Sequence, residues 1–263
     1  MPTDPENGTV FPHLDFSIES PALINPAREP GEAPVSPRVI LAFTRPDYHN
    51  LCRLSQATGP PRYLWDCGIH AGFWEGKGIT VAGPVLGAPY AVMVLEKLIA
   101  LGAKMVLALG WCGSLQENIK VGSLVVPTAA VGGDGASRHY LPDNNQPAPH
   151  PGLCRLLQDN LQAADIPWQA GPIWTTDAFY RETGDQVRHY QGQGVLGVDL
   201  ELAALFAVGT YRQVAVAGLL VVADELADLT WRPGFRSPAF RRGRREAARV
   251  VLTAAAAAEA DNV

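Results

Sequence analysis

The sequence predicts an α/β fold: one domain with a mixed, mostly parallel central sheet flanked by helices, preceded by an extended N-terminal arm. Short apolar segments alternate with segments of helical periodicity, and continuously apolar strands are typical of parallel sheets covered on both faces. The chain has 263 residues, of which 47% are hydrophobic, so it can bury one large core. Eight prolines within residues 1–37 set that segment apart from the domain.

Residues 1–37 are predicted to form the arm, and residues 38–263 the folded domain. Proline lacks a backbone N–H and interrupts helices, so the arm is expected to run extended. Such an arm is either disordered or lies across a partner subunit.

The domain is predicted to alternate strands with helices. Five apolar segments predict buried strands: residues 38–43, 79–83, 104–109, 122–127 and 214–222. Four segments predict helices: residues 90–101, 151–164, 198–208 and 240–260. The alanine run at the end of the last helix is expected to fray from Ala254. Because such sheets bind ligands beyond the carboxyl ends of their strands, functional residues are expected where these strands end.

Composition argues against several classes of function. The net charge of −5 and the pI of about 5.7 disfavour a nucleic-acid or anionic-membrane partner, since both need a basic surface. Residues 1–20 lack a signal-peptide pattern, and no stretch of about 20 residues is apolar enough to span a membrane, so we expect a cytoplasmic protein. The six histidines are dispersed, which argues against a metal site. Four scattered cysteines predict free thiols, with disulfides as the weaker alternative: Cys52, Cys67, Cys112 and Cys154.

Two glycine-containing segments follow predicted strands. Gly110–Ser114 (GWCGS) is expected to form a turn whose backbone N–H groups approach a ligand, or simply a tight structural turn. Gly133–Tyr140 (GDGASRHY) is polar and is either part of a site or a solvated surface loop.

Two later segments combine aromatic or acidic residues with apolar ones. Phe179 and Tyr180 could form a flat wall for a planar heterocyclic base, or belong to the core. Asp199 and Glu201 stand among apolar residues near a predicted helix start, and a buried carboxylate needs hydrogen-bond partners. Glu201 suits the vicinal hydroxyls of a ribose, whereas Asp199 also suits the positive end of the helix dipole.

An acidic residue also ends the last apolar strand. Asp224 follows residues 214–222 after Ala223 and is a candidate general acid, with a helix cap as the alternative. Arg181 and Glu182 follow the aromatic pair and are either contacts to a base or a surface ion pair.

Taken together and in this order, these segments resemble the nucleoside phosphorylase-I superfamily, which contains purine nucleoside phosphorylases, uridine phosphorylases and methylthioadenosine nucleosidases. The likeness covers about Pro12–Glu225. Residues 107–140 are more similar to uridine phosphorylases, which share the G-x-x-G turn and a D-G-A-S-x-H-[FY] segment. Residues 176–204 are more similar to purine phosphorylases, with D-x-F-Y and then G-V-x-M-E-x-A-A, in which Leu200 replaces the methionine.

The resemblance implies a role for individual residues. Glu201 would hold the ribose hydroxyls, and Asp224 would protonate the ring nitrogen of a departing purine-type base. Further substrate contacts are implied at Gly110, Trp111, Cys112, Gly113, Phe179, Tyr180, Asp199 and Leu200. His13 resembles a histidine that reaches the sugar in a neighbouring subunit's site, which implies a homodimer or a homohexamer.

The phosphate site departs from the family pattern. Family phosphorylases carry G-D-P-x-R where residues 42–47 read AFTRPD, and an arginine where this chain has Ala108. Trp111 stands where a small hydroxyl residue is usual. Arg45 and Arg138, with Arg62, are left as candidates for binding phosphate.

Three functions are therefore weighed. The first is phosphorolysis of a nucleoside to free base and sugar 1-phosphate, in purine salvage, with inorganic phosphate as co-substrate and no cofactor. The second is hydrolysis by water, which the missing arginines favour. The third is a non-catalytic nucleoside-binding or storage protein, which two retained carboxylates disfavour because burying them is costly.

Overall fold

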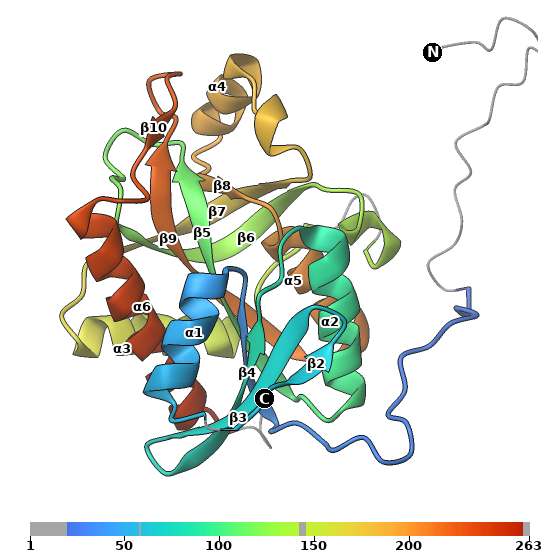
Figure 1. The fold of residues 1–263 in the computed structure, drawn as a ribbon. Coiled ribbons are helices and arrows are strands. Elements are labelled where there is room, and N and C mark those ends of the chain that lie inside the picture. Colours follow the sequence, from blue (N-terminus) through green and yellow to red (C-terminus); the bar gives the residue numbers. More distant parts are fainter. Residues whose placement is uncertain (1–19, 58, 142–145, 260–263) are drawn as a thin grey trace, which may run out of the picture.

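The computed structural model describes residues 20–57, 59–141 and 146–259. Figure 1 shows helices packed around a strongly twisted sheet. Residues 20–37 contain no helix or strand, and His13 lies outside the described residues. The strands are β1 Arg38–Ala42, β2 Arg62–Leu64, β3 Cys67–Trp74, β4 Lys77–Gly83, β5 Met105–Ser114, β6 Leu124–Gly133, β7 Trp168–Thr176, β8 Gly197–Asp199, β9 Ala215–Glu225 and β10 Arg232–Pro233. The helices are α1 Arg45–Leu54, α2 Ala88–Ala100, α3 Pro151–Ala163, α4 Gly184–Gly192, α5 Leu202–Arg212 and α6 Pro238–Ala257, with 3₁₀ turns η1 Ser137–His139 and η2 Phe179–Arg181.

The sheet is mixed, and part of it closes on itself. In the described residues its order is β10-β9-β6-β7-β8-β5-β1-β4-β3-β2, and β9 also pairs with β5. Strands β5, β9, β6, β7 and β8 therefore form a closed ring. Strands β4, β1, β5 and β9 run parallel to one another, so the carboxyl ends of β1, β5 and β9 meet at one edge.

Each face of the sheet buries its own apolar layer. Successive side chains of a strand point to opposite faces, and β5 follows this rule. Val106 and Ala108 belong to the layer covered by α2 and α5. Met105 and Leu107 belong to the layer covered by α1, α3 and α6. This two-sided burial explains why the central strands are continuously apolar, and the predicted α/β class is confirmed.

The predicted turn at Gly110–Ser114 is wrong, because these residues continue β5. They pair with β9 through Ser114 opposite Glu225, with an irregularity between Cys112 and Gly113. The glycines are needed for space. A Cβ atom on Gly110 would lie 2.2 Å from Cδ2 of Phe43, and one on Gly113 would lie 3.1 Å from Oδ2 of Asp224.

Other boundaries also differ from the prediction. The segment 198–208 divides into the end of β8 and α5, which begins at Leu202. Helix α6 begins at Pro238, where Oγ of Ser237 accepts a hydrogen bond from the Phe240 N–H. Contrary to the expected fraying from Ala254, the helix continues to Ala257, and Ala254, Ala255 and Ala256 are buried. Helix α1, strands β2 and β3 and helix α4 were not predicted, because their sequences are short or polar and lack a clear apolar period.

Candidate active site

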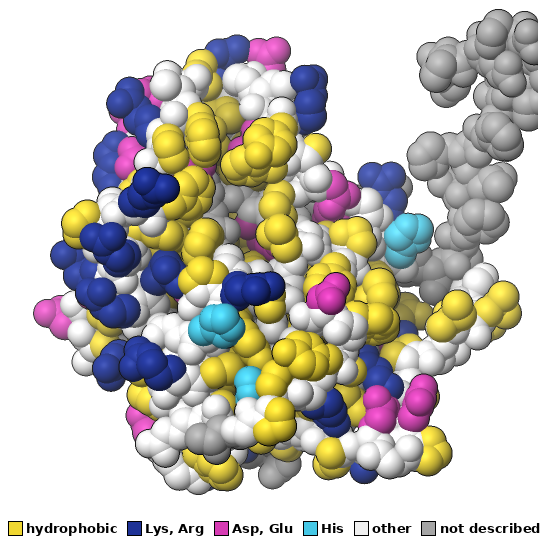
Figure 2. Space-filling view, viewed as in Figure 1, with side chains coloured by type: hydrophobic (Ala, Val, Ile, Leu, Met, Phe, Trp, Pro, Cys, Tyr) yellow, Lys and Arg dark blue, Asp and Glu magenta, His cyan; other side chains and the backbone are white. Residues whose placement is uncertain are grey.

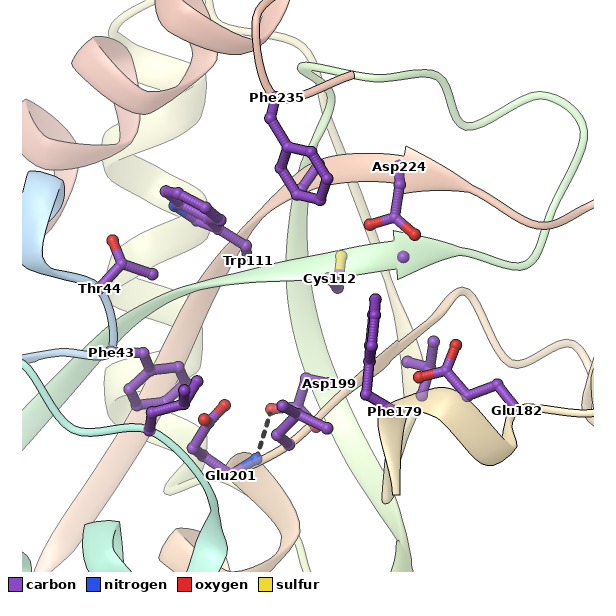
Figure 3. A pocket seen from close by; sticks show the side chains of 15 residues that line it. Phe43, Thr44, Trp111, Cys112, Phe179, Glu182, Asp199, Glu201, Asp224 and Phe235 are labelled. Atoms are coloured by element: carbon purple, nitrogen blue, oxygen red, sulfur yellow. Dashed lines mark hydrogen bonds between the residues drawn. The ribbon is translucent and has the colours of Figure 1, made fainter. Parts of the chain in front are cut away.

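A cavity of about 130 Å³ lies at the edge where β1, β5 and β9 end. Figure 2 shows hydrophobic side chains gathered around a hollow that has acidic side chains inside it. The lining residues are Phe43, Thr44, Leu86, Trp111, Cys112, Gly113, Phe179, Glu182, Val198, Asp199, Leu200, Glu201, Ala223, Asp224 and Phe235. Figure 3 shows Thr44 and Trp111 at one end of this pocket, and Asp224, Phe179 and Glu182 at the other.

Asp224 lies near the carboxyl end of β9, directly opposite Gly113 of β5. Its Oδ2 accepts a hydrogen bond of 3.0 Å from the indole Nε1–H of Trp231. Burial raises the pKa of the Asp224 carboxyl, and the hydrogen bond from Trp231 opposes that rise. A buried carboxyl with a raised pKa at the end of a strand has the properties of a general acid.

Glu201 lies just before α5 and is 3% exposed. Its Oε1 accepts a hydrogen bond of 2.7 Å from the backbone N–H of Gly87. Gly87 precedes α2 with a φ of 85°, in the left-handed region that favours glycine. Burial, together with the nearby Asp199 charge, raises the pKa of Glu201 to about 8, and the bond from Gly87 opposes the rise.

Asp199 lines the same pocket but uses its oxygens to hold the chain. Its Oδ1 accepts a hydrogen bond from the hydroxyl of Thr175. Its Oδ2 accepts hydrogen bonds from the N–H groups of Glu201 and Leu202, at 3.3 and 2.9 Å. Burial raises the pKa of Asp199 to about 6, and these bonds oppose the rise. Asp199 therefore binds the backbone at the start of α5, as the helix-dipole alternative predicts. The main effect of Asp199 is to orient Glu201.

The aromatic pair is divided between the pocket and the surface. Phe179 lines the pocket, whereas Tyr180 is 94% exposed and does not. The ring of Phe179 lies 6.4 Å from that of Trp231 and is nearly perpendicular to it. Leu200 and Cys112 also line the pocket. Glu182, whose carboxyl is half-buried, stands beside Phe179 (Figure 3).

The opposite end of the pocket is built around Asp47, which sequence reasoning missed. Asp47 is fully buried in α1. Its Oδ2 accepts hydrogen bonds from Nε1 of Trp111 at 2.6 Å and from Oγ1 of Thr44 at 2.9 Å. Its Oδ1 is 2.7 Å from both Nε and Nη2 of Arg244, whose guanidinium lies over the Trp111 ring. Asp47 therefore pairs with the arginine that stacks on the pocket-lining Trp111.

Four carboxyl groups line the pocket: Glu182, Asp199, Glu201 and Asp224. Among the described lining residues there is no lysine, arginine or histidine. Arg45 and Arg138 are exposed, and neither lines the pocket. The structure therefore does not bring Arg45 or Arg138 into this pocket, and their role in binding phosphate stays a prediction.

Other features of the described chain restrict the chemistry. Cys52, Cys67, Cys112 and Cys154 are all buried and free, as predicted. Within the described residues, no group of three or more His, Cys, Asp or Glu side chains is arranged to hold a metal ion. No helix in that part of the chain is long and apolar enough to cross a membrane.

The fold and the site define a member of the phosphorylase superfamily. The model of that family matches residues 37–256, and the chain belongs to it. The guanosine phosphorylase of Halorubrum lacusprofundi is 28% identical over 153 residues, which cover 58% of this chain and 64% of that protein. The DeoD-type purine nucleoside phosphorylase of Bacillus cereus is 28% identical over 157 residues, 59% of this chain and 67% of that protein. The match thus spans about two thirds of these relatives.

Solved structures agree with this family. The uridine phosphorylase of Vibrio fischeri superposes with a TM-score of 0.78 at 26% identity, covering 84% of this chain and 92% of that one. The purine nucleoside phosphorylase of Toxoplasma gondii superposes with a TM-score of 0.78 at 23% identity, covering 84% and 91%. The second likeness concerns the fold alone.

Proposed function

We propose that this protein cleaves the N-glycosidic bond of a purine-type nucleoside. The observation that carries the proposal is the placement of two buried carboxyl groups, Asp224 and Glu201, in one pocket with the Phe179 ring. A planar base gains from contact with an aromatic face. A carboxyl group accepts hydrogen bonds from sugar hydroxyls in either charge state, and its protonated form can also donate one.

In the proposed mechanism, Glu201 accepts hydrogen bonds from the vicinal hydroxyls of the ribose and fixes the sugar. As the bond from C1′ to the base nitrogen stretches, positive charge grows on the sugar and negative charge on the base. Asp224 donates its proton to a ring nitrogen of the base, so the base leaves as a neutral molecule. Such a general acid contributes roughly 10²- to 10⁴-fold to the rate.

Inorganic phosphate is the acceptor in the primary proposal, giving free base and sugar 1-phosphate without a cofactor. Membership of the phosphorylase superfamily supports this acceptor. The phosphate would enter at the end formed by Thr44 and Trp111, with Arg45 or Arg138, or Arg62 of a neighbouring subunit, supplying positive charge.

Water is the acceptor in the second proposal, which gives free base and free sugar. One observation favours it: the described wall carries four carboxyl groups, and Arg244 is already paired with Asp47. Such a wall offers a phosphate group no cationic partner, whereas water can both donate to and accept from carboxyl groups.

We further propose a homodimer or homohexamer in which His13 enters a neighbouring pocket. Large apolar side chains are exposed on β2 and just after it, on α2 and at the pocket rim: Tyr63, Trp65, Met93 and Leu86. Exposed apolar groups in one region favour an interface. Deleting residues 1–20 should then weaken nucleoside binding while the domain still folds, and unchanged kinetics would reject this role of the arm.

The proposals are tested by chromatographic release of free base from a panel of purine and pyrimidine nucleosides, with and without phosphate. Release that requires phosphate and yields sugar 1-phosphate supports the phosphorylase. Release of free sugar regardless of phosphate supports the hydrolase. Tight nucleoside binding without release would support a binding or storage protein.

A further inference from the structure

Glu182 lies at the end of the pocket that holds Asp224, and its backbone is fixed on both sides. It directly follows η2, where its N–H approaches the carbonyl of Phe179. Thr183 caps α4, with its side chain and that of Gln186 each accepting a hydrogen bond from the other's backbone N–H. The Glu182 side chain therefore enters the pocket from a well-anchored position (Figure 3).

The Glu182 carboxyl has no protein partner within the described part of the chain. No described hydrogen bond or ion pair satisfies it, and the neighbouring Arg181 is exposed and outside the pocket. Burial, reinforced by the charge of Asp224, raises its pKa to about 7. Because its side chain faces the pocket without a protein donor among the described residues, a ligand N–H group there can donate a hydrogen bond to it.

Glu182 lies at the same end of the pocket as Asp224, and this position selects which part of a base it meets. If Asp224 donates to N7 of a purine, the substituent on C6 lies beside N7 on the same edge of the ring. We propose that Glu182 accepts a hydrogen bond from an exocyclic amino group on C6, so that the enzyme prefers 6-aminopurine nucleosides to 6-oxopurine nucleosides. This inference rests on the proposed function, because Asp224 must face the base.

The chemistry of the two groups gives the direction of the preference. An amino group offers N–H donors to the carboxylate, and a hydrogen bond to a charged acceptor is among the stronger ones. A 6-oxo group presents only lone pairs, which an ionised carboxylate repels. The loss of such a bond corresponds to a roughly 10- to 100-fold change in affinity.

The test is calorimetric binding of adenine and of hypoxanthine, at a pH above 7, to the full chain and to Glu182→Gln. Binding of the free base needs no turnover, so it separates recognition from catalysis. We expect the unchanged protein to bind adenine at least 10-fold more tightly than hypoxanthine. The Glu182→Gln variant should lose most of that ratio, because its amide can donate to the 6-oxo group. Glu117→Gln, at an exposed site outside the pocket, is the matched control and should keep the ratio.

Three results would overturn the inference, and they are distinguishable. If both bases bind and Glu182→Gln leaves their ratio unchanged, or if hypoxanthine binds more tightly to the unchanged protein, Glu182 does not read the C6 substituent and the proposed function stands. If neither base binds and no nucleoside is cleaved, the proposed function fails together with this inference.

Discussion

The indole Nε1–H of Trp231 donates a 3.0 Å hydrogen bond to Oδ2 of Asp224. Trp231 stands just before β10, whose Pro233 pairs with Asp224 itself. The strand pairing therefore holds the donor beside the acid. Because Oδ2 accepts from Trp231, the proton of the neutral carboxyl is favoured on Oδ1. In the proposed mechanism, Trp231 is thus a positioning residue that orients the proton of Asp224 toward the base.

Replacing Trp231 by phenylalanine should shift the pH profile of kcat toward higher pH. The hydrogen bond from Trp231 lowers the pKa of Asp224, so its loss raises that pKa further. Asp224 acts in its protonated form, so activity is present below its pKa and is lost as pH rises through it. In the variant this loss occurs at higher pH, while kcat at the optimum falls roughly three- to tenfold through poorer orientation.

The measurement is kcat against pH for Trp231→Phe, with Trp168→Phe, which lies at the start of β7 outside the pocket, as the control. An unshifted alkaline limb with lower kcat would show a merely structural role for Trp231. An unchanged profile and rate would remove it from the mechanism.

Replacing Asp224 by asparagine should reduce turnover by roughly 10²- to 10⁴-fold, because the amide keeps the shape but cannot supply the proton. Nucleoside binding should change much less. Base release under single-turnover conditions measures the chemical step, and thermal unfolding checks that the variant is folded. Full activity in a folded variant would refute the role of Asp224.

The stability of the protein should fall as pH rises from about 4.5 to about 8, and Glu201 should cause part of the fall. Its pKa is about 8 in the folded chain, against 4.5 as the ordinary value. Between these values the unfolded chain has released the proton that the folded chain keeps, so unfolding becomes easier as pH rises. Across the whole window the contribution of one such group is at most about 5 kcal/mol.

Glu201→Gln removes this titration, so its free energy of unfolding should depend less on pH across the same window. Urea denaturation at pH values near the two ends, at fixed protein concentration, measures the difference. Equal slopes for the variant and the unchanged protein would show that Glu201 is not protonated in the folded chain.

Replacing Gly110 by alanine should damage substrate binding more than folding. The added methyl group would lie 2.2 Å from Cδ2 of Phe43, whose ring lines the pocket, so the ring must move. We expect KM for the nucleoside to rise about tenfold, with destabilisation of about 1 to 3 kcal/mol from the overpacking. Gly192→Ala, which meets no atom within 4 Å, is the control. Unchanged KM would show that the Phe43 ring does not contact the substrate.

The sequence alone was sufficient for the fold class and for the positions of Asp224 and Glu201 in the pocket wall. Continuous apolar strands report burial on both faces, and the residues that follow such strands collect at one edge of a parallel sheet. These are local patterns, so they can be read without knowing which segments meet. The same patterns did not predict that β5 extends through Gly110–Ser114, because glycine is typical of turns. The close neighbours that require these glycines, Phe43 and Asp224, lie far away in the sequence.

Only the tertiary structure decided what surrounds these two carboxyl groups. Asp47 meets Trp111 across 64 positions and Arg244 across 197, and no local period predicts such pairs. Trp231 likewise reaches Asp224 through a loop whose direction depends on the pairing of β10. Glu182 reaches the same end of the pocket from a 3₁₀ turn that the cap of α4 holds in place. Contacts of this kind arise from the closure of the sheet and the packing of α1 against α6. These long-range contacts determine the charge of the pocket, whereas the sequence pattern determines that the pocket lies at the carboxyl ends of the strands.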